Sequence, residues 1–171
     1  MSDQTYPASS NRLRRKVLSI DDDPAVSGIL RVRLASFGIE VARAFSGTQG
    51  YWTALDEKPD LIICDLTMPD GEGNYVFGRL QDNPLTKHVP FVVLSGQCNP
   101  AVKRTLLSMG VAAFLPKPIV FRELLQELRP FLDFVERADP GACARAAKEL
   151  SPALERAGYE RQQDANRGRR P

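Results

Sequence analysis

The sequence lacks any run of about 18 apolar residues, so it predicts no membrane-spanning helix. Its first 16 residues have no apolar core, which excludes a typical signal peptide. The single histidine, His88, lies in a polar stretch, and a surface loop explains it better than a catalytic or phosphorylated role. The three cysteines, Cys64, Cys98 and Cys143, lack the spacing of metal ligands. Such scattered cysteines indicate reduced thiols, and we expect a cytoplasmic protein.

The charge is nearly balanced, because 23 Lys and Arg residues face 21 Asp and Glu residues and give a net charge of +2. This balance gives no reason to expect direct binding to nucleic acid or to a membrane. With 43% hydrophobic and 26% charged residues, the composition is that of a soluble globular protein. Changes in composition divide the chain into a flexible lead at 1–14, one domain at 15–133 and an alanine-rich helical tail or linker at 134–171.

Short apolar runs alternate with amphipathic segments from residue 16 onward. We predict strands at 16–20, 39–42, 60–64, 90–94 and 111–115, and helices at 24–37, 46–58, 74–82, 99–109 and 121–132. Strands that are almost continuously apolar and alternate with helices are typical of a parallel sheet covered on both faces. We therefore expect an α/β fold with a doubly wound five-stranded sheet in the flavodoxin-like order 2-1-3-4-5.

Acidic side chains follow two of these strands. Asp21 and Asp22 come directly after the first strand and Asp65 after the third, and these strands are neighbours in the predicted order. Carboxylates that converge at one edge repel one another, and a bound Mg²⁺ relieves the repulsion because it prefers oxygen ligands. We therefore predict that these three acids form a Mg²⁺ site. Asp23 has a different role, because an acid before Pro24 is typical of a helix N-cap.

Two further polar residues follow strands at the same edge. Ser95 ends the fourth strand, and Lys117 comes shortly after the fifth. A hydroxyl and an ammonium beside a metal-bound carboxylate form a cradle for a phosphoryl group, because each takes part of the charge on its oxygens. The sequence therefore predicts a phosphoryl-transfer site in which Asp65, Ser95 and Lys117 act together.

The segments VLSIDDDP, LIICDLTMPDGEG, FVVLSG and GVAAFLPKP lie within residues 14–133 and resemble the receiver domain of two-component response regulators (CheY-like proteins). The resemblance implies that Asp65 is the phosphoacceptor and takes its phosphoryl group from a sensor histidine kinase or a phosphotransfer protein. It also implies that the backbone carbonyl of Thr67 joins the three acids as a Mg²⁺ ligand. Ser95 would bond to a phosphoryl oxygen, and Lys117 would pair with the phosphoaspartate. The Lys117–Pro118 peptide bond would be cis.

By the same resemblance, the chain is a regulatory phosphoacceptor that catalyses its own phosphorylation and dephosphorylation, and is not an enzyme for a separate substrate. Phe114 occupies the position of the switch aromatic, and we expect its ring to move inward when Ser95 is drawn to the phosphoryl group. Gly96 leaves room for the phosphate and loosens the loop that carries it.

Other loop positions differ from the usual pattern of the family. Gly71 and Glu72 replace the residues common in the loop after the third strand, which is a mild change. Thr67 and Gln97 flank the path of an attacking water molecule, so we expect them to set the lifetime of the phosphorylated form.

The output of the predicted switch is less well defined. Residues 134–171 are too few for a further domain with its own core, so we expect output through an unknown partner or a missing effector domain. A homodimer through the face formed by the fourth helix, the fifth strand and the fifth helix is a further expectation.

Three other classes of protein start from similar features. An aspartyl-phosphate phosphatase would need a second acid two residues after its nucleophile, where this chain has Thr67. A receiver-like interaction module that is never phosphorylated would not need the intact set of Asp22, Asp65, Ser95 and Lys117. A flavodoxin is set aside, because the first loop, DDDPAV, is acidic where a phosphate loop needs hydroxyls or glycines.

Overall fold

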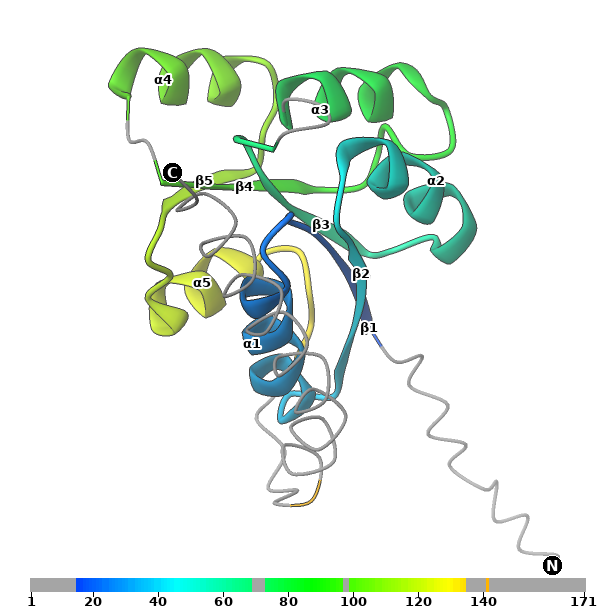
Figure 1. The fold of residues 1–171 in the computed structure, drawn as a ribbon, viewed down its shortest axis with the longest axis vertical. Helices are drawn as coiled ribbons and strands as arrows, with labels where there is room; N and C mark the ends of the chain where they lie inside the picture. Colours follow the sequence, from blue (N-terminus) through cyan, green and yellow to red (C-terminus); the bar gives the residue numbers. More distant parts are fainter. Residues whose placement is uncertain (1–14, 69–72, 97–98, 135–140, 142–171) are drawn as a thin grey trace, which may run out of the picture.

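The computed structural model describes residues 15–68, 73–96, 99–134 and 141, and it contains a five-stranded parallel sheet. The elements are β1 (Arg15–Ile20), α1 (Pro24–Ala35), β2 (Ile39–Ala44), α2 (Gly47–Glu57), β3 (Leu61–Asp65), α3 (Gly73–Asp82), β4 (Phe91–Ser95), α4 (Pro100–Ser108), β5 (Ala113–Pro116) and α5 (Phe121–Leu128). The strand order is β2-β1-β3-β4-β5 (Figure 1). The predicted flavodoxin-like fold is therefore confirmed.

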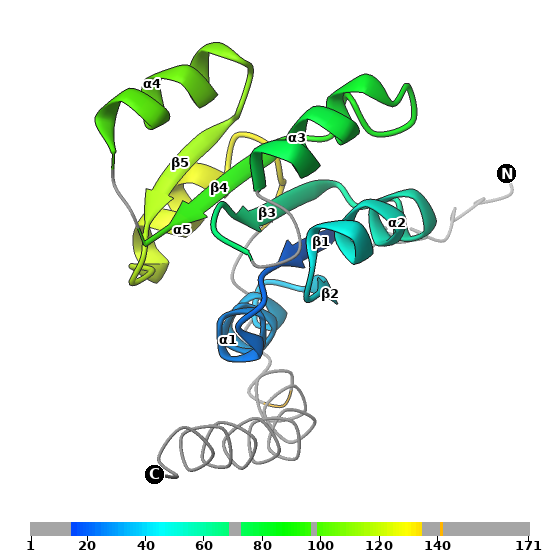
Figure 2. The same cartoon turned by 45° about the horizontal axis from the view of Figure 1, so that its top comes forward.

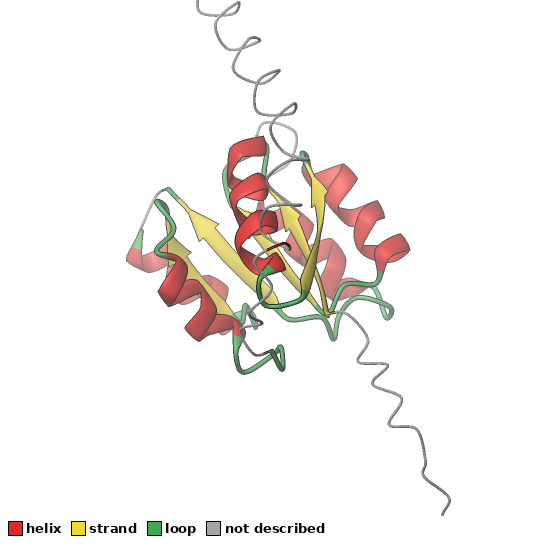
Figure 3. Ribbon diagram, turned by 90° about the horizontal axis from the view of Figure 1, so that it is seen from below, coloured by secondary structure: helices red, strands yellow, loops and turns green. Residues whose placement is uncertain are grey.

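Helices cover both faces of the sheet. Helices α1 and α5 lie on one face and α2, α3 and α4 on the other (Figures 1 and 2). Side chains alternate along each strand, so that Leu61 and Ile63 of β3 pack with α1 and α5 while Ile62 and Cys64 face the opposite core. Figure 3 shows the strands between the two helical layers. No helix in the described part of the chain is long and apolar enough to cross a bilayer.

Side-chain caps fix the points where the chain turns from strand to helix. The Asp23 carboxylate accepts a hydrogen bond from the Ala25 N–H at 2.9 Å at the start of α1, as the sequence predicts. The Asn99 side chain caps α4 in the same way, accepting from the Ala101 N–H at 2.9 Å. Both caps lie at the carboxyl ends of strands, and the Asp23 cap holds the loop that carries Asp21 and Asp22.

Helix α2 lies close to the end of β1. A Cβ atom at Gly50 would lie 2.5 Å from Cδ1 of Ile20, closer than carbon atoms approach. Glycine therefore permits this packing. Since Ile20 directly precedes Asp21, the contact helps to position the first acidic loop.

Several predicted boundaries are wrong: α1 ends at Ala35 instead of 37 and β5 begins at Ala113 instead of 111, and two others have a clear physical reason. Strand β2 continues to Ala44 instead of ending at 42, because the Asp21 N–H bonds to the Ala44 carbonyl at 3.0 Å and prolongs the pairing. Helix α5 ends at Leu128 instead of 132, since Pro130 lacks the N–H that a helix needs and disfavours helical backbone before it.

After α5 the chain turns back into the core. Leu132 is 1% exposed, and the Phe134 ring packs edge-on against Phe37 with 5.5 Å between centroids. Residues 1–14 and, apart from Phe134 and Gly141, the predicted tail at 134–171 lie outside the described residues. The division of the chain into lead, domain and tail therefore stays a prediction.

The packing after α5 predicts that Leu132 is part of the cooperative core although it lies outside any helix. Leu132→Ala should lower the free energy of unfolding by about 2–5 kcal/mol, the usual cost of deleting a buried leucine side chain. Phe131→Ala is the matched control, because Phe131 is 38% exposed and its loss should cost less than about 1 kcal/mol. Urea denaturation followed by circular dichroism measures both. Equal losses would contradict the assignment.

Candidate functional site

The predicted site residues meet at the carboxyl edge of the sheet. Asp21 follows β1, Asp65 ends β3 and Ser95 ends β4, and all three are buried. Strand β5 brings Lys117 to the same edge, where its N–H donates to the Ser95 carbonyl at 2.8 Å. The parallel register places these strand ends side by side, since Asp65 pairs with Leu94 one residue before Ser95. The four predicted residues therefore come from four strands and lie together.

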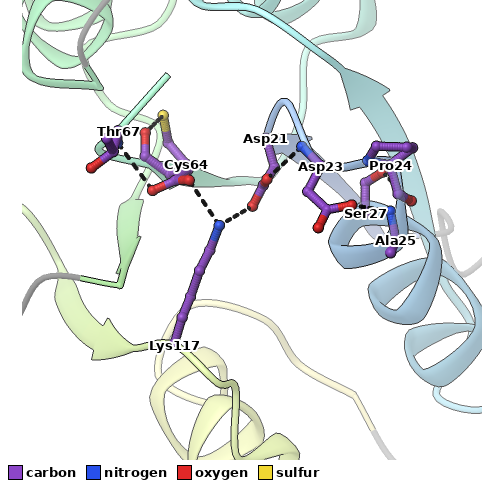
Figure 4. A network of polar contacts seen from close by, with 9 residues as sticks. Asp21, Asp23, Pro24, Ala25, Ser27, Cys64, Thr67 and Lys117 are labelled. Atoms are coloured by element: carbon purple, nitrogen blue, oxygen red, sulfur yellow. Dashed lines mark hydrogen bonds and ion pairs between the residues drawn. The ribbon is translucent and has the colours of Figure 1, made fainter. Parts of the chain in front are cut away.

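The Lys117 ammonium bridges two carboxylates. Its Nζ donates to Oδ2 of Asp21 at 2.7 Å and to Oδ2 of Asp65 at 2.8 Å (Figure 4). Backbone groups hold the second oxygen of each acid, since the Asp23 N–H donates to Asp21 at 2.9 Å and the Thr67 N–H donates to Asp65 at 3.0 Å. The protein's own groups thus orient both carboxylates from two sides.

Burial dominates the electrostatics of this cluster. It raises the pKa of Asp21 above its usual value, although Lys117 and the Asp23 N–H both favour the ionised carboxylate. Burial also lowers the pKa of Lys117, but the hydrogen bonds and charges of the two acids outweigh it, so the net direction is upward. The site therefore keeps a charged ammonium beside Asp21, whose ionised carboxylate is disfavoured by burial.

The Cys64 thiol is inert in this arrangement. It is buried beside the carboxylates, and burial raises its pKa far above the usual value, with the charges of Asp65 and Asp21 adding to the rise. Its Sγ lies 3.1 Å from the Asp65 carbonyl oxygen, to which the thiol donates. The thiol thus fills space behind the phosphoacceptor candidate and takes no part in nucleophilic chemistry.

The donor set fits a hard divalent cation. Asp21, Asp22 and Asp65 each offer a carboxylate oxygen, and these oxygens lie within 4.8 Å of one another. Asp21 and Asp65 are buried, whereas Asp22 is exposed, so the group opens to solvent on one side. Mg²⁺ takes carboxylate oxygens and keeps several water ligands, which suits such a half-open site. The role of the Thr67 carbonyl as a further ligand stays a prediction.

The residues predicted to transmit the signal are also in place. The Lys117–Pro118 peptide bond is cis, as predicted. A Cβ atom at Gly96 would meet nothing within 4 Å, so the role of this glycine in leaving room for the phosphate stays a prediction. The Phe114 ring, expected to move inward on phosphorylation, already lies inside this structure with 5% exposure, and Lys103 Nζ lies 5.9 Å from its centroid.

Sequence reasoning missed Gly73, the first residue of α3. A Cβ atom there would lie 2.8 Å from the Leu66 Cα and would collide with the Asp65 carbonyl oxygen. The Gly73 N–H donates to the Leu66 carbonyl at 2.9 Å, which ties α3 to the end of β3. Only a contact of backbone with backbone explains this glycine, and no spacing in the sequence shows it. Gly71, Glu72 and Gln97 lie outside the described residues.

Comparisons with known proteins point in one direction. Residues 17–129 match the family model described as the response regulator receiver domain. The KDP operon transcriptional regulatory protein KdpE of Escherichia coli is 35% identical over 113 residues, which are 66% of this chain and 49% of that protein. The DNA-binding dual master transcriptional regulator RpaA of Synechocystis is 32% identical over 127 residues, covering 74% of this chain and 53% of that protein. The chain thus spans about half the length of these relatives.

Solved structures of response regulators have the same fold as this chain. The chemotaxis protein CheY4 of Vibrio cholerae superposes with a TM-score of 0.64 at 27% identity, covering 69% of this chain and 98% of that one. A putative response regulator from Chloroflexus aurantiacus gives a TM-score of 0.64 at 31% identity, covering 68% of this chain and 96% of that one.

The raised pKa of Asp21 predicts that this acid lowers stability at neutral pH. A carboxyl group whose pKa is raised by folding binds its proton more tightly in the folded state, so stability falls as the pH rises through that pKa. Without Mg²⁺, Asp21→Asn should therefore be about 1 kcal/mol more stable than the unmodified chain at pH 7, with the difference shrinking towards acidic pH. Thermal melts across pH measure this, with the exposed Asp133→Asn as control. A variant less stable at pH 7 would contradict the prediction.

The contact at Gly73 predicts a strong positional difference within one helix. Gly73→Ala should destabilise the fold by about 1–3 kcal/mol, because the new methyl group must displace the backbone of Asp65 and Leu66. Gly78 lies in the same helix with open space around its Cα, so Gly78→Ala should stabilise by about 0.5–1 kcal/mol. Urea denaturation of both variants tests the pair. If both gain stability, the contact is not a constraint.

Proposed function

The chain belongs to the family of response regulator receiver domains, and from this premise we propose that Asp65 accepts a phosphoryl group from a phosphohistidine and thereby switches the domain between two states. Receiver domains interact with histidine kinases or phosphotransfer proteins, and relatives of this chain are transcriptional regulators. The observation that carries the proposal is the bridge of Lys117 between Asp65 and Asp21 at the sheet edge.

The transfer follows from the groups around Asp65. A carboxylate oxygen of Asp65 attacks the phosphorus, the new O–P bond forms as the P–N bond of the phosphohistidine breaks, and the imidazole leaves with the bonding electrons and takes a proton from water. Lys117, already 2.8 Å from Asp65, would pair with the phosphoryl oxygens of the product. A Mg²⁺ ion held by Asp21, Asp22 and Asp65 would neutralise part of the charge on the transferred group.

The buried position of Phe114 refines the proposed switch. Phosphorylation adds about −1.5 to −2 charges at this edge and would draw the Ser95 hydroxyl towards the new oxygens. The Phe114 ring lies inside, and we propose that phosphorylation favours this inward position of the ring over an outward one.

The output is proposed to pass through the surface of α4, β5 and α5. This surface carries the exposed apolar side chains of Leu107, Met109 and Val120, at 41%, 52% and 53% exposure. A homodimer or an unknown partner would cover them, and an effector domain beyond the described residues is the other route. The domain acts as a regulator that catalyses its own phosphorylation. An interaction module without phosphorylation is less favoured, because it would not need an ammonium between two buried acids.

Phosphorylation at Asp65 predicts a single covalent addition in a defined place. After incubation with acetyl phosphate and Mg²⁺, intact-mass spectrometry should show one added phosphoryl group on the unmodified chain and none on Asp65→Asn, because the amide is not a nucleophile here. Asp82→Asn, at an exposed acid on α3, is the matched control and should be phosphorylated. An added phosphoryl group on Asp65→Asn would contradict the proposal. If no species is labelled, binding of beryllofluoride separates a short-lived phosphoaspartate from an inactive site.

A further inference from the structure

A second surface feature lies away from the phosphoacceptor, at the outer edge of the sheet. A groove of about 590 Å³ runs between β2 and α2, lined by Ala42, Arg43, Trp52, Thr53, Asp56 and Glu57. Strand β2 is an edge strand of the sheet, and α2 lies beside it (Figures 1 and 2). None of these residues belongs to the proposed switch.

The backbone of β2 offers hydrogen-bonding groups to this groove. The Ala44 carbonyl faces inward, because it accepts from the Asp21 N–H at 3.0 Å. Since the backbone groups of successive residues in a strand point to opposite edges, the N–H and C=O groups of Val41 and Arg43 point outward. An open strand edge of this kind accepts an extended segment of chain.

An exposed aromatic side chain lies beside this edge. Trp52 is 63% exposed, and its indole packs edge-on against Tyr51 with 5.4 Å between centroids. The Asn83 side chain donates to the Tyr51 hydroxyl at 2.9 Å and so fixes the supporting ring. The free face of an indole held in this way attracts apolar side chains and cations, above all arginine.

The groove is acidic near the start of β2 and the end of α2. A hydrogen bond from Lys16 to Glu57 raises the pKa of Lys16, and the charges of Glu40 and Asp56 add to the rise, so three carboxylates surround one ammonium. Glu40 and Asp56 are exposed. Lys16 offsets Glu57, and Arg43, the cation in the groove lining, lies 5.6 Å from the centroid of the Phe45 ring. The exposed carboxylates of Glu40 and Asp56 therefore remain to attract a basic segment beside the indole.

A basic segment of this same chain starts at that end of the groove. The described chain begins at Arg15, which pairs with Ile39 at the start of β2. The preceding residues carry Arg12 and Arg14 on either side of Leu13. Extended chain spans about 3.3 Å per residue, so residues 1–14 are long enough to pass beneath β2 and run the length of its edge.

We propose that residues 1–14 bind along the outer edge of β2, with the arginines of residues 12–14 at Asp56 and Glu40 and the rest of the segment over Trp52. This occupant would cover the open strand edge, which otherwise invites pairing with other chains.

The only tryptophan of the chain reports on this groove, so its fluorescence tests the proposal directly. Quenching by acrylamide, a neutral quencher, should be about twofold stronger in the full-length Arg12→Glu/Arg14→Glu variant than in the unmodified chain, since one face of the indole is uncovered. The control variant Arg167→Glu/Arg169→Glu changes the net charge equally at the other end of the chain and should match the unmodified chain. About 0.5 M NaCl should also increase quenching in the unmodified chain, because it screens exposed charge pairs.

A charge swap identifies the partner within the groove. Asp56→Arg added to Arg12→Glu/Arg14→Glu should restore protection of Trp52, whereas Asp56→Arg alone should lose it. Equal quenching in all variants would overturn the proposal. Protection that grows with protein concentration would overturn it too, because the groove would then hold a second copy instead of the chain's own segment.

Discussion

The ammonium of Lys117 between Asp21 and Asp65 is the contact around which the carboxyl edge of the sheet is arranged. It joins the ends of β1, β3 and β5, so it requires the strand order that places those ends at one edge. Two buried acids without it would be too costly to ionise. Neighbouring backbone groups orient the same two carboxylates, since the N–H groups of Asp23 and Thr67 donate hydrogen bonds to Asp21 and Asp65. Gly73 allows α3 to begin in contact with the backbone of Asp65.

Much of this site could be predicted from the sequence, because the period of the apolar runs determines where strands end. Asp21, Asp65, Ser95 and Lys117 each follow such a run, and parallel strands with right-handed crossovers bring their carboxyl ends together. The sequence also predicted that Asp23, unlike Asp21 and Asp22, caps a helix, because an acid directly before a proline is typical of a helix N-cap. These inferences are local, which is why a single sequence was sufficient for them.

What the sequence could not show depends on contacts between distant segments. The need for glycine at position 73 arises from the backbone of Asp65, and that contact has no periodicity. The inward position of Phe114 and the early end of α5 likewise depend on packing around them. The charge around Lys16 combines Glu40 of β2 with Asp56 and Glu57 of α2, so only the folded chain shows the acidic end of the groove.

The burial of Phe134 has a consequence for anything that follows it in the chain. Its ring is held against Phe37, which lies just before the amino end of β2, whereas Asp65 lies at the carboxyl ends of the strands. A module linked after Phe134 would therefore be attached at the amino ends of the strands. A strand of six residues spans about 20 Å, which separates that attachment point from Asp65. The length of the linker after Phe134, and not only the affinity of the module for the domain, would decide whether the module could block a kinase from reaching Asp65. The access of a kinase to Asp65 and the distance that a linked module can reach could thus evolve separately.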